Sequence, residues 1–403
     1  MKLTRVLSTA ILGATVFLAL YAQAADKERT IYSFNRASGS SGPAGGVYLD
    51  QSGNLYGFGG GFFELSPNGS GGWNYSKLST SNCGYPTGPL VRDQVGNFYV
   101  GDYFSQVCEF SPDGSGGWVA SVIYTFNSVS GYGPSSLLLD AAGNLYGVNG
   151  ANGAYGFGYV FELSPRAGGW SLTDLHDFNG NDGNASASGM SGSGVLGGLI
   201  MDAVGNLYGV TFAGGSAPAC STKCGVVFKL INNSGIWTET VLHRFKGADG
   251  AQPDAPLTMD AAGNLYGTTT AGGSAGFGVV FKISFVSGKP VARVLHSFTN
   301  ADGDGAYPQS TLVMDAAGNL YGTTQVGGGR GDCQVERDRG GCGMAFKLSP
   351  VGNQWKESLL HAFSSVGDGG FPSGLVMDGN GNLYGGSFIG GAANQGLVFE
   401  IVP

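Results

Sequence analysis

The chain has 403 residues, of which 75 are glycine, 12% are aromatic and 12% are charged. This composition is typical of a turn-rich all-β protein and excludes the helical and disordered classes. The formal net charge of −8 argues against nucleic acid as a partner, because binding to phosphates needs an excess of basic side chains.

The first 24 residues have the pattern of a secretory signal peptide. Lys2 and Arg5 form a basic start, an apolar run covers 6–21, and Ala22-Gln23-Ala24 is a cleavage motif of small residues. We predict cleavage after Ala24. No later stretch is long and apolar enough to span a bilayer, so we expect a secreted or periplasmic protein without a membrane span, acting as a monomer.

The next feature along the chain is a motif, Asp-x-x-Gly-Asn-(Leu/Phe)-Tyr, that recurs at intervals of 43 to 63 residues. Each copy predicts a β-hairpin in which the aspartate caps the turn and Gly-Asn adopts positive φ. One aspartate per repeat in fixed phase indicates a structural turn rather than a metal site. The seven aspartates are Asp50, Asp93, Asp140, Asp202, Asp260, Asp315 and Asp378.

Each repeat continues with a glycine-rich loop, a third strand such as 280–283 and a fourth strand such as 237–245. Four short strands repeated seven times predict an all-β, seven-bladed β-propeller. The mature chain starts on a segment that matches a fourth strand, 30–34, and ends on one that matches a third, 397–401. We therefore expect one domain, 25–403, whose N-terminal strand completes the last blade. A stacked β-solenoid is the alternative, and it fits four-stranded units poorly.

All four histidines occupy one position of the fourth strand, in the motif Leu-His-x-Phe. Alternation along a strand places Trp237, Val241, His243 and Phe245 on one face, which we expect to pack between neighbouring blades. Histidines on the outer strands of four blades are not expected to converge on one metal ion. They are His176, His243, His296 and His361.

The six cysteines fit an oxidising compartment. One pair lies in a single loop, and a second pair lies in the corresponding loop two repeats later. Neither loop has a histidine or a second cysteine pair beside it, which favours local disulfides over zinc. The third pair follows by elimination. The expected pairs are Cys220 with Cys224, Cys333 with Cys342, and Cys83 with Cys108.

In a propeller, the loops between second and third strands and the connections between blades open on the same face. Variable loops on that face form the expected binding surface. The sixth repeat has the longest such loop, and it gathers six charged residues in a charge-poor chain. A solvated surface hairpin is the alternative. The predicted ligand-binding residues are Arg330, Asp332, Glu336, Arg337, Asp338 and Arg339.

A calcium loop is the only cofactor site that the sequence suggests. Asn300, Asp302 and Asp304 place oxygen ligands at alternate positions, as calcium loops do. The distant glutamate of an EF-hand is missing, and the segment resembles glycine-rich turns elsewhere in the chain. We therefore favour a turn, with Ca²⁺ as the alternative.

The motifs Asp-x-x-Gly-Asn-Leu-Tyr-Gly-Thr-Thr, Val-Val-Phe-Lys-Leu and Leu-His-x-Phe-x-x-x-Asp-Gly-x-x-Pro resemble the GloVer tandem repeats of bacterial exported proteins, the "choice-of-anchor" family. The resemblance covers residues 30–403. In the first two repeats Ser79 and Tyr124 replace the histidine, and Cys108 replaces the third-strand phenylalanine. Family members often carry a C-terminal sorting anchor. Since Pro403 directly follows the last strand, the resemblance implies an anchorless member that is released or kept in the periplasm.

The resemblance implies no particular activity. The turn is also loosely similar to those of NHL-repeat propellers and of the virginiamycin B lyase type. In the lyase type, a histidine and acidic residues near the channel act with a divalent metal. Here every histidine belongs to the fourth-strand position.

Two functions from different classes remain. We favour a binding module that recognises a glycan, a peptide or a cell-surface or extracellular protein through its loop face. The alternative is an extracellular metal-assisted lyase or hydrolase with carboxylates at the channel mouth, whose perturbed pKa values would reveal it. The balance leans away from an enzyme, and we assign no catalytic residue.

Overall fold

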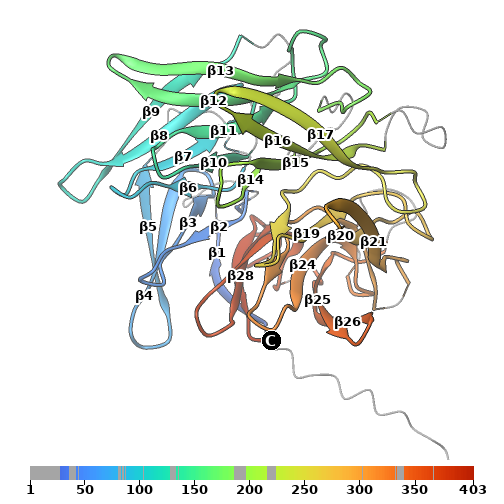
Figure 1. The fold of residues 1–403 in the computed structure, drawn as a ribbon. Coiled ribbons are helices and arrows are strands. Elements are labelled where there is room, and N and C mark those ends of the chain that lie inside the picture. Colours follow the sequence, from blue (N-terminus) through green and yellow to red (C-terminus); the bar gives the residue numbers. More distant parts are fainter. Residues whose placement is uncertain are drawn as a thin grey trace, which may run out of the picture.

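The computed structural model describes residues 28–35, 42–43, 45–79, 83, 86, 88–102, 104–127, 133–134, 136–185, 197–215, 224–301, 303–331, 333, 340–365 and 367–403. These residues form seven antiparallel sheets arranged in a ring, with no helix among them (Figure 1). The protein is therefore a seven-bladed β-propeller, as the sequence predicts. In the part described, no segment is a helix that could cross a membrane.

The first four blades follow one another along the chain. Blade one contains β2 (Val47–Leu49), β3 (Leu55–Phe58), β4 (Phe62–Pro67) and β5 (Trp73–Ser79). Blade two contains β6 (Val91–Arg92), β7 (Phe98–Gly101), β8 (Gln106–Pro112) and β9 (Trp118–Thr125). Blade three contains β10 (Leu137–Leu139), β11 (Leu145–Asn149), β12 (Tyr159–Arg166) and β13 (Gly169–Asp177). Blade four contains β14 (Ile200–Met201), β15 (Leu207–Thr211), β16 (Val226–Asn233) and β17 (Ile236–Arg244).

The last three blades close the ring. Blade five contains β18 (Thr258–Met259), β19 (Leu265–Thr269), β20 (Val279–Val286) and β21 (Lys289–Ser297). In blade six, β22 (Gly305–Pro308) and β23 (Val313–Met314) both pair with β24 (Leu320–Gly327), which β25 (Met344–Val351) and β26 (Gln354–Ala362) follow. Blade seven contains β27 (Gly370–Met377), β28 (Leu383–Ile389) and β29 (Leu397–Ile401).

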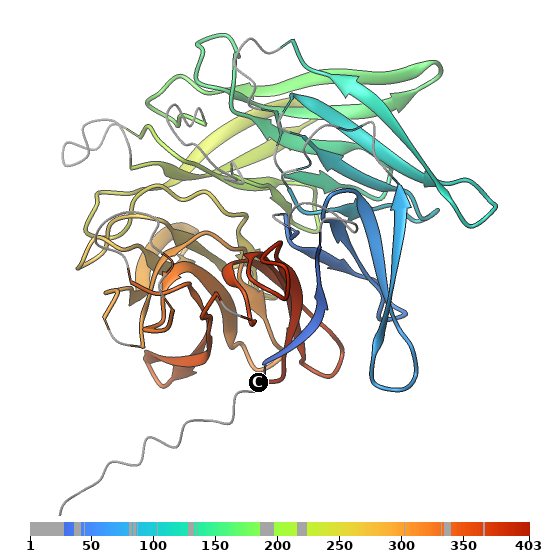
Figure 2. The ribbon, with the colours of Figure 1, turned by 180° about the vertical axis from the view of Figure 1, so that it is seen from behind.

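The N-terminal strand completes the last blade, as predicted. β1 (Glu28–Ser33) pairs antiparallel with β29, so strands from the two ends of the chain lie side by side (Figures 1 and 2). The pairing covers a sheet edge that would otherwise expose unpaired backbone groups.

The repeated aspartate builds the turn between the first and second strands of every blade. In blade five the Asp260 carboxylate accepts hydrogen bonds from the Asn264 backbone at 2.8 Å, the Asn264 side chain at 2.7 Å and the Tyr266 hydroxyl at 3.0 Å. Gly263 has the expected positive φ of 78°. Asn264 is not among the positive-φ residues, so the prediction that it shares that role is wrong; it binds the aspartate instead. Partial burial opposes ionisation of Asp260, yet these hydrogen bonds lower its pKa.

Each fourth strand contains a β-bulge, which reverses the faces to which the following side chains point. In β17 the register to β16 shifts between the partners of Val227 and Phe228, which leaves Leu242 as a bulge. Trp237 and Val241 consequently pack in the core between blades three and four, while Phe245 packs in the core between blades four and five. The prediction that these residues share one face with His243 is therefore wrong, because strict alternation does not survive a bulge.

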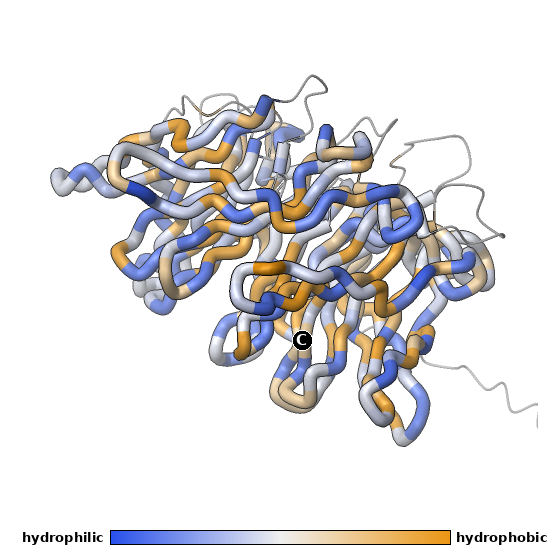
Figure 3. The backbone as a smooth tube through the Cα atoms, turned by 45° about the horizontal axis from the view of Figure 1, so that its top comes forward, coloured by the Kyte–Doolittle hydropathy of each residue, from blue (hydrophilic) through white to orange (hydrophobic). Residues whose placement is uncertain are grey.

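The hydrophobic core is divided into seven clusters, each lying between two neighbouring blades. Figure 3 shows hydrophobic and hydrophilic residues interspersed along the backbone of the blades. We call the boundary between two neighbouring blades a seam. At six of the seven seams, the phenylalanine of Leu-His-x-Phe, or its counterpart, packs against the third-strand phenylalanine of the next blade. The pairs, with centroid separations of 4.9–5.3 Å, are Phe34–Phe63, Phe126–Phe161, Phe178–Phe228, Phe245–Phe281, Phe298–Phe346 and Phe363–Phe399.

The third-strand phenylalanine explains the glycine of Leu-Tyr-Gly. Gly267 pairs with Phe281 across β19 and β20, and a Cβ on Gly267 would lie 2.6 Å from Phe281 Cζ. Blade two departs from both positions together, since Val100 stands opposite Cys108. There the predicted Cys83–Cys108 disulfide occupies the seam in place of the phenylalanine pair.

We predict that Gly267→Ala lowers the free energy of unfolding by about 1–3 kcal/mol, because the added methyl group overpacks a buried ring. Equilibrium urea unfolding measures the change. Gly379→Ala is the matched control: nothing lies within 4 Å of its Cβ position, and other repeats carry alanine there. The control should change stability by no more than about 0.5 kcal/mol. Equal losses in both variants would contradict the ring-over-glycine explanation.

Candidate functional site

Connections between blades form backbone hydrogen bonds with loops of both blades that they join. In the connection from blade four to blade five, Gln252 N–H donates to the Cys224 carbonyl at 3.0 Å. Ala251 and Ala271 exchange two backbone hydrogen bonds, at 2.7 and 3.0 Å, with the loop of blade five. Because these loops and connections bond one another directly, they form one continuous surface, which we call the loop face.

The charged loop of blade six lies mostly outside the described residues. Of the six predicted ligand-binding residues, Arg330 is described and exposed, whereas Asp332, Glu336, Arg337, Asp338 and Arg339 lie outside the described part. The predicted Cys333–Cys342 disulfide is present, and the Cys342 N–H donates to the Arg330 carbonyl at 3.1 Å. Cys224 is also disulfide-bonded; Cys220, its predicted partner, falls outside the described residues.

Three equivalent positions on the loop face have left-handed backbone. Gln252, Tyr307 and Phe371 have φ of 59°, 59° and 54°, and each precedes a proline. Each N–H donates to a loop carbonyl of the preceding blade. Positive φ is uncommon for bulky residues and costs about 1–3 kcal/mol, and such residues cluster at functional sites. The side chains of all three are half-buried at the loop face.

Further aromatic side chains on the loop face are exposed. Tyr155 lies between β11 and β12 and is 64% exposed, and Phe388 near the end of β28 is 47% exposed. The Tyr307 ring lies edge-on to Phe277, with the ring centroids 5.8 Å apart. Exposed aromatic rings beside backbone polar groups are the features of a ligand-binding surface in a charge-poor protein.

Each histidine lies beside an aspartate of the connection that follows it. The Nε2 atoms of His243, His296 and His361 lie 3.0, 3.2 and 3.2 Å from Asp249, Asp304 and Asp368, and these contacts are hydrogen bonds. The four histidines therefore lie at four separate seams.

The proposed calcium ligand Asp304 is engaged inside the protein. Besides His296, its carboxylate accepts bonds from the Thr299 N–H at 2.8 Å and the Thr299 hydroxyl at 2.6 Å. Asn300 Oδ1 is buried without a hydrogen-bond partner, and Asp302 falls outside the part of the chain that the structure describes.

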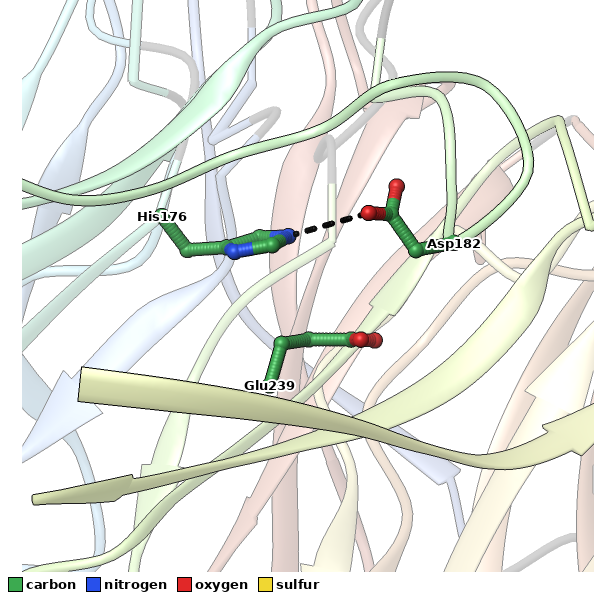
Figure 4. A group of neighbouring side chains, drawn as sticks. All are labelled: His176, Asp182 and Glu239. Atoms are coloured by element: carbon green, nitrogen blue, oxygen red, sulfur yellow. Dashed lines mark ion pairs between the residues drawn. The ribbon is translucent and has the colours of Figure 1, made fainter.

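One seam brings a third ionisable group to the histidine. His176 on β13, Asp182 in the following connection and Glu239 on β17 offer ligand atoms that all lie within 4.8 Å of one another. In Figure 4 the imidazole and the Glu239 side chain both extend towards Asp182. We call these residues the seam cluster. It is the only such group of three among the described residues.

The seam cluster is largely shielded from water. The side chains of His176 and Asp182 are 19% and 14% exposed, and Nε2 lies 3.5 Å from Asp182 Oδ2. Burial lowers the pKa of His176, although the Asp182 charge opposes this shift. Burial, and then the Asp182 charge, raise the pKa of Glu239 to about 7.

Sequence reasoning missed Glu239 because it assumed strict alternation along the fourth strand, which places Trp237 and His243 on one face. The bulge at Leu242 sends His243 forward to blade five and leaves Glu239 facing blade three. The signal that could have found it was the recurrence of Trp-x-Glu at Trp237 and Trp355, which marks Glu239 and Glu357 as equivalent.

Glu357 supplies a pH-dependent prediction. Burial raises its pKa to about 7, from the usual 4.5. Since the folded protein then binds the proton more tightly than the unfolded chain, its stability falls as the pH rises from about 4.5 to 7. Glutamine cannot ionise. We therefore expect the free energy of unfolding of Glu357→Gln, relative to that of the wild type, to be about 1–2 kcal/mol higher at pH 8 than at pH 4.5, allowing for solvent screening. Urea unfolding at both pH values measures this. A pH-independent difference would contradict the assignment.

Comparisons with known proteins agree with this architecture. No curated protein sequence matches the chain. The extracellular domain of a candidate hybrid two-component system from B. thetaiotaomicron matches with a TM-score of 0.55 and 13% identity, over 94% of this chain and 41% of that one. A candidate 6-phosphogluconolactonase from Bacteroides uniformis matches with a TM-score of 0.51 and 13% identity, over 90% and 99%. The chain thus spans about two fifths of the first of these proteins. At this identity the likeness concerns the fold alone.

The sequence profile of the Gloeobacter/Verrucomicrobia repeat matches residues 101–336, which is more than half of the chain. The matched region includes four of the seven turn aspartates, Asp140, Asp202, Asp260 and Asp315, together with copies of Leu-Tyr-Gly and Leu-His-x-Phe. The chain therefore belongs to the Gloeobacter/Verrucomicrobia repeat family.

Proposed function

We propose that this protein is an exported binding module whose loop face recognises a glycan. The main support for this proposal is the strained backbone at Gln252, Tyr307 and Phe371, where φ is positive. Nothing in a propeller blade requires a bulky residue at positive φ, and the other repeats show that the blade forms with different residues there. A binding role supplies a reason to retain these side chains.

A glycan fits the chemistry of this surface. Sugar rings present apolar C–H faces, which stack on aromatic rings such as Tyr307 and Tyr155, and hydroxyls, which bond to exposed backbone groups. With only 12% charged residues, the protein offers little for a highly charged partner. Arg330, at the start of the charged loop of blade six, is exposed and adds one polar group to this surface.

Export is part of the proposal. The signal peptide proposed for residues 1–24 would direct the chain out of the cytoplasm, and the disulfides Cys83–Cys108 and Cys333–Cys342 suit an oxidising compartment.

The enzyme alternative receives less support. It needs acidic groups with raised pKa at the channel mouth, whereas Asp174, Glu239 and Glu357 lie on the fourth strands β13, β17 and β26. Asp254, in the connection to blade five, is buried and its pKa is raised by burial. Within the described residues it joins no group of potential metal ligands.

Binding of the mature protein to insoluble chitin, cellulose and peptidoglycan tests the proposal. We expect retention on at least one, and Tyr307→Gly should weaken that binding at least tenfold. Because glycine adopts positive φ without strain, the variant should keep its stability to within about 1 kcal/mol. Phe285→Ser, at the hairpin on the opposite face, is the matched control and should bind as the wild type does. No retention by the wild type, or equal retention by Tyr307→Gly, would overturn the proposal.

A further inference from the structure

We propose that the seam cluster, His176, Asp182 and Glu239, binds a zinc ion that clips blade three to blade four. This inference is independent of glycan binding, because the cluster lies between strands of the seam and shares no residue with the aromatic surface of the loop face.

The first observation is that the histidine and the aspartate lie farther apart here than in the other seams. In the three other seams with a histidine, Nε2 makes a hydrogen bond to its aspartate at 3.0–3.2 Å. At His176 the separation is 3.5 Å, and Nε2 is buried with no hydrogen-bond partner. Asp182 accepts bonds from the Asn179 N–H at 2.9 Å and the Asn179 side chain at 2.6 Å, much as Asp249 accepts a bond from the Lys246 N–H in the next seam. These bonds hold the carboxylate in place beside the imidazole.

The second observation is the glutamate from the next blade. Glu239 Oε1 is also buried without a hydrogen-bond partner. A native structure rarely leaves two such atoms side by side, and an ion between them is one explanation. Leaving each atom unpaired destabilises the fold, and a metal ion bound by both atoms removes that cost.

The distances suit a zinc ion. With zinc bonds of about 2.0–2.2 Å, neighbouring ligands of a tetrahedral site lie about 3.4 Å apart. The Nε2–Oδ2 separation of 3.5 Å already matches one edge of such a tetrahedron. The remaining separations, at most 4.8 Å, close with small side-chain rotations of Glu239.

The donor set selects the metal. One imidazole nitrogen with two carboxylate oxygens is a ligand combination that zinc accepts, leaving a fourth position for water. Calcium and magnesium prefer six or more oxygen ligands, and an imidazole is a poor substitute. Two carboxylates also balance the double positive charge of the ion, so the seam gains no net charge.

The other seams provide natural controls. Blade five carries Ala292 at the position of Glu239, so the His243–Asp249 pair has no third ligand. Blade six carries Glu357 there, but His296 and Asp304 are already hydrogen-bonded at 3.2 Å. Only at the seam between blades three and four do the described residues combine an open pair with a glutamate.

The test is a titration of the chelator-dialysed mature protein with Zn²⁺, followed by Co²⁺ as a spectroscopic probe and Ca²⁺ as a comparison. We expect one equivalent of Zn²⁺ to bind, Co²⁺ to give the visible absorption of a four-coordinate site, and Tm to rise by about 3 °C at zinc concentrations 100 times Kd. Ca²⁺ should leave Tm unchanged.

Variants identify the ligands. Glu239→Gln and, as a second variant, Asp182→Asn should each weaken Zn²⁺ binding at least tenfold and remove the Tm increase. Glu357→Gln, the equivalent change two blades away, should bind Zn²⁺ like the wild type. Absence of saturable Zn²⁺ binding, wild-type affinity in Glu239→Gln, or the same loss in Glu357→Gln would each overturn the proposal. Glycan retention is measured without added metal, so either proposal can fail alone.

Discussion

The packing of a third-strand phenylalanine over the glycine of Leu-Tyr-Gly is the contact on which the closed circle of blades depends. Fully burying a phenylalanine contributes about 1.5–3 kcal/mol, and the geometry of each ring pair adds about 0.5–1.5 kcal/mol. Burial of the rings at the seams therefore stabilises the fold more than their mutual orientation does. The third-strand phenylalanine reaches the preceding blade only because its partner strand has no Cβ beneath the ring, as at Gly267 and Phe281. Blade two shows the same constraint in reverse, since Cys108 in place of the ring permits Val100 in place of the glycine.

This constraint makes the blades mutually dependent. Each blade buries its rings against a neighbour, so an isolated blade has no core of its own. Closure follows from the same requirement: Phe34, just beyond β1, packs on Phe63 of blade one while β1 pairs with β29 of blade seven. The N-terminal segment thus covers the edge of the last sheet and also supplies a phenylalanine to the seam between blades seven and one. The Cys83–Cys108 disulfide takes the place of ring packing where the phenylalanines are missing.

The features that the sequence predicts correctly are those repeated in fixed phase. Blade number, closure by the N-terminal strand and the turn aspartates follow from a motif that recurs seven times. The Cys333–Cys342 disulfide follows from two cysteines that lie close together in one loop. The bulge at Leu242 escaped prediction because it leaves the spacing of the motif unchanged and alters only which seam each side chain faces. The left-handed residues before proline were equally hidden, since φ at Tyr307 is set by hydrogen bonds to the neighbouring blade rather than by local sequence.

The same bulge explains how a repeat protein can acquire a distinct site without altering its fold. Without the bulge, strict alternation would place Glu239 and His243 on the same face, and the histidine of one blade would not meet the glutamate of the next. With the bulge, Glu239 faces backward to His176 and His243 faces forward to Asp249. One substitution at the glutamate position, as at Ala292, then adds or removes a carboxylate at a single seam while the phenylalanine packing stays intact. The seam can therefore vary in chemistry while it remains constant in structure.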